Sequence, residues 1–369
     1  MSEKKIGLSE IKYFPDKSPD KVKPTSITLD LTHRCPFKCS GCIESQAMKH
    51  SSKTSLHKKT VCRLISQFAA TGGKEILFYG GEPTMHPEFS SIILHAAKDI
   101  PLIRVVTNGA FLAKPKVSES LFRAAEMTEV IIRVSLNAGT SKTHERLHHA
   151  NGFFNQIIDG MQVLKGSGVK VSVSFMVEDK NANEITKAFR IAEEVGAKDF
   201  WIRPKTGLHG IGLVPMRATN RNLVLNSSYQ IEQSRSDFTP SYHIERWFLE
   251  FLKYNIPPNT TKSYTSCYYC SASRLIITPP DPGIVWSCTY WRGDPLFYVT
   301  DLKKTPFGSD EFESRRQKSI RRVNPRKDCI GVICNRDEAN KAIWRRYQAK
   351  KRISIEKPIT KRIAKFITI

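Results

Sequence analysis

The sequence predicts an α/β protein: a partial (β/α)6 TIM barrel followed by a small cysteine-bearing domain. Between about residues 25 and 206, six short apolar runs of β type alternate with longer segments whose apolar residues recur at three- and four-residue spacing. Near-continuous apolar strands joined by helical crossovers imply a parallel sheet covered by helices. Because a closed barrel of this kind needs eight strands, we expect this one to stay open.

The expected strands and helices follow one another in strict alternation. We expect strands at Ser26–Leu31, Glu75–Tyr79, Ile103–Thr107, Val130–Leu136, Val169–Val177 and Phe200–Arg203. We expect helices at Leu56–Ala70, Phe89–Lys98, Ser118–Glu126, Phe154–Lys165 and Ala182–Val195. Such sheets place chemistry at the carboxyl ends of their strands, so motifs directly after a strand carry extra weight.

The pattern divides the chain into five segments. They are a polar N-terminal arm (1–24), the barrel core (25–206), an irregular connector (207–264) whose clearest helical stretch is Trp247–Tyr254, an auxiliary cysteine domain (265–350) ending in a helix at Glu338–Lys350, and a basic tail (351–369).

Composition excludes several classes of protein. A chain of 369 residues with 40% hydrophobic and 25% charged side chains can bury a large core, which excludes disorder over most of its length. No apolar run approaches the roughly 20 residues that span a bilayer, and the amino terminus lacks the apolar segment of a signal peptide. We therefore expect a cytoplasmic protein without a membrane partner. In that compartment nine cysteines indicate metal or redox use rather than disulfides.

The formal charge of +23 is concentrated near the carboxyl end, where residues 301–369 hold 20 basic and 8 acidic side chains. Such a field raises the local concentration of anions, which predicts an anionic substrate or partner. A solvated basic surface explains the charge equally well. Charge alone supports nucleic acid as a partner.

Three cysteines stand directly after the first expected strand, in the pattern Cys35-x3-Cys39-x2-Cys42. Three thiolates suit a [4Fe-4S] cluster that leaves one iron open to a non-protein ligand. A zinc site with His33 as fourth ligand is the alternative.

A glycine pair and a glutamate, Gly80-Gly81-Glu82, end the second expected strand. Glycines let backbone carbonyls approach a ligand closely, and a carboxylate can receive an ammonium group. Taken alone, such a turn is more often an ordinary loop.

Together, the cysteine triad and the glycine-glutamate turn resemble the radical S-adenosylmethionine (SAM) superfamily over about residues 25–205. The resemblance implies a [4Fe-4S] cluster whose open iron binds SAM, and a turn at Gly80, Gly81 and Glu82 that contacts the methionine amino group. It also implies reductive cleavage of SAM to a 5′-deoxyadenosyl radical that abstracts hydrogen from a substrate. An electron donor such as flavodoxin or ferredoxin is then expected as a partner.

The resemblance extends to further strand ends. Polar residues similar to family positions near the SAM ribose and carboxylate are Thr107, Asn108, Ser135 and Asn137. Arg203, at the end of the sixth strand, is expected to hold a SAM or substrate carboxylate, with a surface role as alternative. The family usually has an aromatic residue where this chain has Gly41, so Phe37 is expected to pack on the adenine. Simple turn and capping roles are the alternative for each of these residues.

A second group of cysteines follows the connector, in the pattern Cys270-x12-Gly283-x4-Cys288 with Cys329 and Cys334 later in the chain. It resembles the SPASM and twitch extensions of radical SAM enzymes, and the number of cysteines suits one auxiliary [4Fe-4S] cluster of the twitch form. The resemblance implies that Cys270, Cys288, Cys329 and Cys334 ligate this cluster while Cys267 stays outside it. Zinc on the same thiolates is the alternative.

The expected function is that of a radical SAM enzyme that oxidises a polar metabolite or peptide by two electrons, assisted by the auxiliary cluster. The alternative is radical cyclisation, rearrangement or cross-linking of a nucleotide or of a ribosomally made peptide. The lack of a separate leader-recognition domain before Cys35 argues against the peptide version. A nucleic-acid-binding protein with structural metal clusters is the alternative from another class, and it rests on charge alone.

Overall fold

A computed structural model gives the structure of the chain. It describes residues 18–39, 41–42, 54–207, 210–234, 240–267, 273–334, 337, 340–345 and 347–348. No helix in these residues is long and apolar enough to cross a membrane. The basic tail and most of the N-terminal arm lie outside the described residues, as does Cys270.

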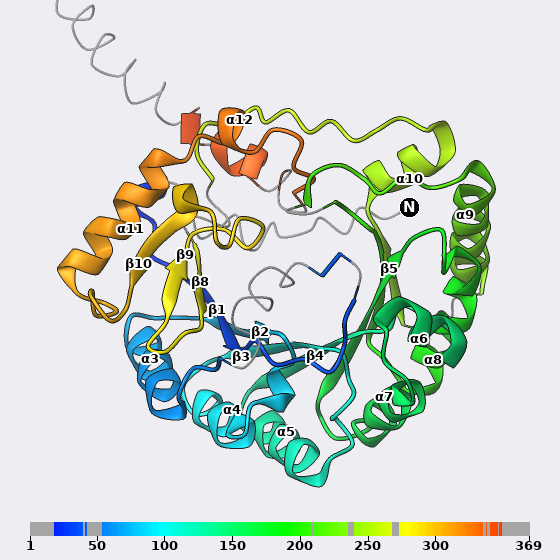
Figure 1. Cartoon of the computed structure of the whole chain (residues 1–369), viewed down its shortest axis with the longest axis horizontal. Coiled ribbons are helices and arrows are strands. Elements are labelled where there is room, and N and C mark those ends of the chain that lie inside the picture. The colour runs from blue at the N-terminus through cyan, green and yellow to red at the C-terminus, as the bar shows by residue number, and fades with distance from the viewer. Residues whose placement is uncertain are drawn as a thin grey trace, which may run out of the picture.

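The described strands form one ten-stranded sheet in the order β10-β9-β8-β1-β2-β3-β4-β5-β6-β7. Figure 1 shows this sheet as an open arc. The strands are β1 (Ser26–Thr32), β2 (Glu75–Gly80), β3 (Leu102–Thr107), β4 (Glu129–Ser135), β5 (Lys170–Val177), β6 (Asp199–Pro204), β7 (Ser241–Ile244), β8 (Arg274–Thr278), β9 (Ile284–Trp286) and β10 (Tyr298–Asp301).

Helices cover the outer face of the arc, and α10 and α12 lie on its open side (Figure 1). The α-helices are α3 (Lys58–Ala70), α4 (Phe89–Ala97), α5 (Pro115–Met127), α6 (Ser141–His148), α7 (Phe153–Val163), α8 (Ile185–Glu194), α9 (Ala218–Gln233), α10 (Arg246–Tyr254), α11 (Asp310–Arg322) and α12 (Pro325–Asp328). Short 3-10 helices are η1 (Pro19–Lys21), η2 (Pro83–Met85), η3 (Ala182–Glu184) and η6 (Pro295–Phe297).

The predicted parallel core is confirmed. Strands β1 to β6 pair in sequence order, each parallel to the next, and their bounds differ from the predicted ones by one or two residues. The agreement arises because side chains along each strand alternate between the two faces of the sheet. Those that face the helices are fully buried, as Ile76 and Phe78 on β2 are. Buried apolar side chains on one face fix the register of each strand.

Two regions differ from the sequence-based expectation. The connector, predicted to be irregular apart from one helix, also contains α9 and a seventh parallel strand, β7, paired with β6. Helix α9 was missed because few of its side chains are buried, among them Val224 and Ile231, so its sequence shows little apolar periodicity. Helix α6 was missed as well, because it is short and mostly polar.

The auxiliary segment continues the sheet of the barrel. Strand β8 pairs in parallel with β1, and β9 pairs antiparallel with both β8 and β10. The turn between β8 and β9 contains Gly283, which has φ +121° and faces the side chain of Ile277, a position that a Cβ atom could not occupy. Strand β8 of this hairpin lies beside β1, and strand β9 ends two residues before Cys288. The second cysteine group is therefore attached to the edge of the barrel sheet.

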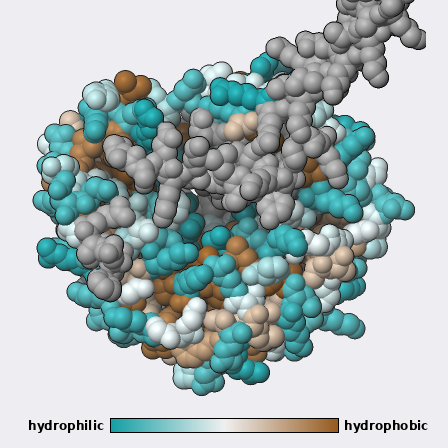
Figure 2. Space-filling model, turned by 180° about the vertical axis from the view of Figure 1, so that it is seen from behind, coloured by the Kyte–Doolittle hydropathy of each residue, from teal (hydrophilic) through white to brown (hydrophobic). Residues whose placement is uncertain are grey.

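The two faces of the arc differ in polarity. Along β2, β3 and β6, buried residues face the helices and alternate with partly exposed ones that face the interior of the arc. From the side opposite to Figure 1, hydrophilic side chains dominate the rim of the molecule and hydrophobic ones gather near the middle (Figure 2). The interior of the arc therefore carries polar side chains, such as Tyr79 and Arg203, beside apolar ones, such as Leu77 and Val106.

Candidate active site

The loop after β1 carries the first three cysteines. The backbone N–H of Cys42 donates to the carbonyl oxygen of Cys39 at 3.4 Å, and Cys35 and Cys42 both interact electrostatically with Cys39. Burial raises the pKa of Cys35 to about 11 and that of Cys39 to about 12. Buried thiols side by side at this pKa become thiolates when a metal replaces the proton, so this trio has the chemistry of a metal-cluster site.

Helix α6 anchors this loop from the side. The Nδ1 atom of His148 lies 2.9 Å from the Sγ atom of Cys39, and the backbone N–H of Lys38 donates to the carbonyl oxygen of His148 at 2.9 Å. Phe37, which is 3% exposed, packs against the rings of His148 and Phe153 at 5.2 and 5.3 Å between centroids. Its ring therefore holds the loop on α6 and α7, and adenine packing on Phe37 stays a prediction.

The carboxylate of Glu82 lies fully buried at the end of β2. It accepts hydrogen bonds from the backbone N–H of Thr84 at 3.1 Å, from the hydroxyl of Thr107 at 2.7 Å and from the backbone N–H of Asn108 at 2.7 Å, and the Thr84 hydroxyl also donates to it. Burial raises the pKa of Glu82, and these hydrogen bonds oppose that rise. The carboxylate thereby ties the ends of β2 and β3 together.

Gly80 and Gly81 make this turn fit against the start of the cysteine loop. A Cβ atom on Gly81 would lie 2.7 Å from the carbonyl oxygen of His33, and one on Gly80 would lie 2.6 Å from that of Thr32. The N–H of Gly81 donates to the Thr32 carbonyl oxygen at 2.8 Å, and the N–H of Glu82 donates to the Arg34 carbonyl oxygen at 2.7 Å. The glycines therefore allow two backbone segments to approach, which clamps the turn to the cysteine loop.

The other polar strand-end residues lie around the same rim. Asn108 directs its Nδ2 atom at the Sγ atom of Cys35, 3.8 Å away, and its backbone binds Glu82. Ser135 is the last residue of β4 and is partly exposed. The Oδ1 atom of Asn137 accepts from the backbone N–H of Met176 at 2.8 Å, so this side chain joins β4 to β5. Binding of SAM by these residues stays a prediction.

Gly41 precedes the third cysteine in a left-handed conformation, φ +79°, and a Cβ atom there would lie 3.3 Å from the side chain of Lys205. Lys205 forms an ion pair with Glu178 at 2.9 Å and interacts electrostatically with Cys39. The side chain of Lys205 therefore lies beside Gly41 and close to the first cysteines.

A buried ion pair crosses the interior of the arc. Asp30 on β1 is fully buried, and its Oδ2 atom lies 3.1 Å from the Nη1 atom of Arg292, which follows the β9 strand. The guanidinium of Arg292 also lies over the ring of Tyr79, 5.0 Å from its centroid. Burial raises the pKa of Asp30, although Arg292 acts in the opposite direction. This pair attaches the auxiliary segment to the inside of the barrel.

Tyr79 connects the two cysteine groups through the interior. Burial raises its pKa, and its hydroxyl interacts electrostatically with Cys42, Tyr290 and Arg203. Arg203, at the end of β6, lies 5.4 Å from the ring centroid of Trp201. Because Cys42 belongs to the first group and Tyr290 follows Cys288 by two residues, the polar interior lies between the groups.

The second cysteine group comes together from separate segments. Cys288 is buried, and burial followed by the charges of Cys267, Cys334 and Cys329 raises its pKa well above the usual value. Burial also raises the pKa of Cys329 to about 12, with Cys267 and Cys334 contributing. Cys267, expected to stay outside the ligand set, therefore lies beside the other three. Ligation by Cys270 stays a prediction, since this residue lies outside the described part of the chain.

Charged and polar side chains surround this second group. The Tyr264 hydroxyl donates to Asp337 at 2.7 Å, and the ammonium of Lys262 lies 3.4 Å from the same carboxylate. Lys262 also donates to the carbonyl oxygen of Val332 at 2.8 Å. These bonds hold the loop between Cys329 and Cys334 against the segment that carries Cys267.

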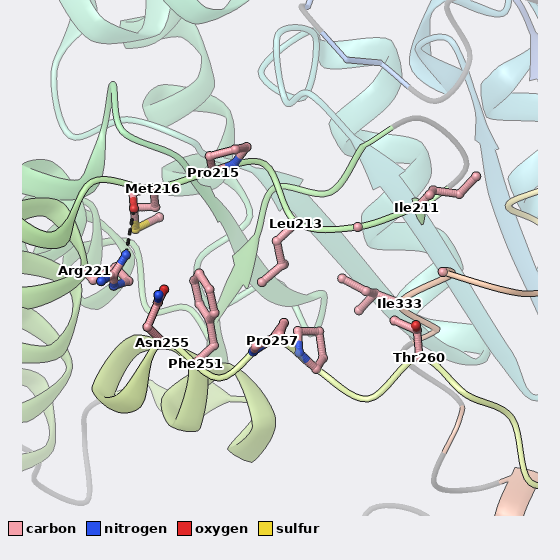
Figure 3. Close-up of a pocket in the computed structure, with 13 residues that line it drawn as sticks. Ile211, Leu213, Pro215, Met216, Arg221, Phe251, Asn255, Pro257, Thr260 and Ile333 are labelled. Atoms are coloured by element: carbon pink, nitrogen blue, oxygen red, sulfur yellow. Dashed lines mark hydrogen bonds between the residues drawn. The ribbon is translucent and has the colours of Figure 1, made fainter.

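An apolar pocket of about 640 Å³ opens beside that loop (Figure 3). It lies between the chain that follows β6, represented by Leu213 and Met216, and helix α10, represented by Phe251. Ile333, from the loop between Cys329 and Cys334, forms a further wall. Among the described residues that line it, Arg221 alone is charged, and it donates to the Met216 carbonyl oxygen at 3.0 Å.

A single zinc ion needs ligands that converge on one point. In the described ranges no three Cys, His, Asp or Glu side chains are arranged to hold one metal ion. His33, the candidate fourth zinc ligand, has its Nδ1 atom 3.1 Å from the Thr54 hydroxyl.

Sequence reasoning missed His148, Lys205 and Asp30. The signal for Asp30 was available, because an acidic residue inside an otherwise apolar strand must find a buried partner. His144 and His148 stand four residues apart and so share one helix face, but the missed helix α6 concealed this. No local pattern pointed to Lys205.

Comparison with known proteins agrees with this geometry. Residues 29–191 match the Radical SAM superfamily. The chain is 27% identical to a PqqA peptide cyclase of Gluconobacter oxydans (strain 621H), over 79% of this chain and 84% of that protein. It is 29% identical to the antilisterial bacteriocin subtilosin biosynthesis protein AlbA of Bacillus subtilis (strain 168), over 48% of this chain and 38% of that protein.

The fold resembles that of a solved structure of Streptococcus suis SuiB bound to precursor peptide SuiA. The TM-score is 0.58 at 16% identity, covering 80% of this chain and 68% of that one. An open parallel barrel with three cysteines after its first strand therefore defines a radical SAM domain. The chain therefore carries the domain of a radical SAM enzyme, which uses SAM and a [4Fe-4S] cluster.

Proposed function

We propose that this enzyme cross-links or cyclises a ribosomally made peptide. The observation that carries the proposal is the similarity to PqqA peptide cyclase, which extends over 79% of this chain and 84% of that protein. The similarity to AlbA, a bacteriocin biosynthesis protein, points the same way. The first expectation from the sequence was two-electron oxidation of a polar metabolite or peptide. The two relatives described above support peptide cyclisation or cross-linking better, so peptide modification takes its place.

The first cysteine group would hold the cluster that binds SAM. When bound, the cluster and SAM supply a radical that removes a hydrogen atom from a substrate carbon. Cys35, Cys39 and Cys42 would be its ligands, and the turn at Gly80, Gly81 and Glu82 would keep the loop in place. Cys288, Cys329 and Cys334 would hold an auxiliary cluster, with a fourth ligand from the pair Cys267 and Cys270.

The interior of the arc would receive the part of the peptide that reacts. Asp30, Tyr79 and Arg292 line it with buried polar groups, and it lies between the two cysteine groups. The ion pair holds the Arg292 and Tyr79 side chains at fixed positions, which would give a bound peptide a preorganised polar surface. A peptide segment bound there would face both cluster sites.

The apolar pocket would hold a neighbouring hydrophobic side chain of the same peptide. Leu213, Phe251 and Ile333 offer an apolar surface, and Ile333 directly precedes Cys334. A volume of about 640 Å³ falls within the range of ligand pockets, which is roughly 300–1,000 Å³. Burial of one aliphatic or aromatic side chain would stabilise the complex by about 1.5–3 kcal/mol.

Anaerobic reconstitution followed by mass spectrometry tests the proposal. The reconstituted enzyme is supplied with SAM, dithionite and short peptides encoded beside its gene. We expect one of these peptides to lose a pair of hydrogen atoms, with a fragmentation gap between the two linked residues. A variant with Phe251→Ala in the pocket should raise KM more than it lowers kcat. SAM cleavage accompanied by oxidation of a small metabolite, with every peptide unchanged, would contradict the proposal.

A further inference from the structure

His148 is the last residue of α6 and makes two contacts with the cysteine loop. Its Nδ1 atom lies 2.9 Å from the Sγ atom of Cys39, and its carbonyl oxygen accepts from the backbone N–H of Lys38 at 2.9 Å. The side chain of His148 thus holds Cys39, and its backbone holds the neighbouring residue Lys38.

The chemistry of the ligand decides the direction of the side-chain hydrogen bond. A cysteine that ligates iron is a thiolate, which accepts hydrogen bonds and cannot donate them. The imidazole must therefore carry its hydrogen on Nδ1 and donate to Cys39. This step rests on the proposed role of Cys39 as a ligand of the SAM-binding cluster.

The ring of His148 is held in this orientation by its neighbours. It is 5% exposed, and it packs against Phe37 at 5.2 Å and His144 at 4.5 Å between ring centroids. Cys35 receives a much longer contact from Asn108, 3.8 Å from Nδ2 to Sγ. His148 is therefore a close and preorganised side-chain donor to Cys39, while Cys35 also accepts a hydrogen bond from the backbone of Phe37.

A hydrogen bond to a ligating sulfur changes the balance between the two oxidation states of a cluster. The reduced cluster carries one more negative charge than the oxidised one, so an N–H group directed at its sulfur stabilises the reduced state more strongly. We propose that His148 is a positioning residue that raises the reduction potential of the SAM-binding cluster through its hydrogen bond to Cys39. The substitution of this donor then makes the cluster harder to reduce.

Three substitutions separate the hydrogen bond from the packing. His148→Phe keeps an aromatic ring against Phe37 and removes the donor. His148→Asn places an amide N–H close to the position of Nδ1 and restores a donor. His144→Phe is the matched control, because His144 is fully buried and packs against the rings of His148 and Phe37 at 4.5 and 5.4 Å between centroids. No contact of His144 with a cysteine is found among the described residues.

The experiment is an EPR-monitored redox titration of the reconstituted full-length enzyme at one fixed pH. The SAM-binding cluster is recognised by the change that added SAM causes in its signal, which separates it from the auxiliary cluster. We expect His148→Phe to lower the ratio of reduced to oxidised cluster about tenfold at a fixed solution potential, which is 59 mV for a one-electron couple. We expect His148→Asn to recover most of this shift and His144→Phe to show none of it.

An unchanged potential in His148→Phe, or an equal shift in His144→Phe, would overturn the proposal, since the second result would assign the effect to packing. If His148→Phe does not load the cluster, His148→Met removes the donor with a more flexible side chain and is held to the same expectation. A wild-type enzyme whose EPR signal does not respond to SAM would instead contradict the cluster assignment of Cys39 under the proposed function. The two failures therefore give different results.

Discussion

The two cysteine groups have similar surroundings and different origins. In the first group, Cys35, Cys39 and Cys42 lie within eight residues of one loop after β1. In the second group, Cys267, Cys288, Cys329 and Cys334 come from segments joined by the β8–β9 hairpin, helix α11 and helix α12. A local loop fixes the spacing of its ligands by itself, whereas the second group exists only when the auxiliary segment has folded onto β1.

The chemistry of the thiols does not distinguish the groups. Burial raises the pKa of Cys39 and of Cys329, in each case to about 12. A thiol with that pKa stays protonated at neutral pH until a metal replaces its proton. The groups therefore differ in how they are assembled and in their proposed roles. Substitutions in each group test these two differences.

The largest effect is expected from the first group. Replacing Cys35, Cys39 and Cys42 together by alanine should lower 5′-deoxyadenosine formation under dithionite below detection, because the SAM-binding cluster then has no thiolate ligands. Chromatography of the reaction products measures this. Cys62→Ala on α3 is the control, since that thiol belongs to neither group, and it should leave the rate unchanged. Formation of 5′-deoxyadenosine by the triple variant at the wild-type rate would contradict the assignment of the SAM-binding cluster to the first group.

The second group should show a partial effect. Cys288→Ser and Cys267→Ser should each lower the iron content by about half, because the proposed auxiliary four-iron cluster is lost while the proposed SAM-binding cluster remains and SAM cleavage continues. The expectation for Cys267 follows from its place beside Cys288, Cys329 and Cys334. Full iron content in Cys267→Ser, combined with loss of half the iron in Cys270→Ser, would contradict this expectation. It would identify Cys270 as the fourth ligand, as the motif predicts.

The ion pair between Asp30 and Arg292 connects the two regions. Arg292→Met should lower the free energy of unfolding by about 3 kcal/mol, because it leaves the buried carboxylate without its cation. Urea denaturation measures this, with Arg246→Met as the control, since the Arg246 side chain is 88% exposed. Adding Asp30→Asn to Arg292→Met should recover part of the loss. A loss of less than about 0.5 kcal/mol would mean that the auxiliary segment stays on the barrel without this pair.

The smallest effect concerns pH and the packing beneath the first group. Burial lowers the pKa of His144 to about 4, below its ordinary value of 6.5. As pH falls from 6.5 toward 4, the unfolded chain binds a proton that the folded chain does not, so stability is present above this window and is lost within it. Between pH 7 and pH 5.5 the wild type should lose about 1 kcal/mol more than His144→Phe in urea unfolding. Equal losses in both proteins would show that His144 does not couple folding to pH.

Much of the barrel could be predicted because its information is local. The apolar alternation of β2 and β3 and the helical spacing between them identify the elements within one or two residues. Helix α9 could not be predicted in the same way, since only a few of its side chains face the core. Strand β7 has four residues, none of them fully buried, so its sequence carries almost no strand signal.

The sequence by itself determined the parallel core, the cysteine triad and the glycine-glutamate turn, because each depends on residues close together in the chain. The tertiary structure decided the rest. It placed Arg292 on Asp30, His148 on Cys39 and Cys267 beside Cys288, and each of these contacts joins residues that no motif spacing relates. The physical reason is that a local pattern fixes backbone conformation and burial, while the partner of a buried charge or sulfur is set by which elements the folded sheet brings together.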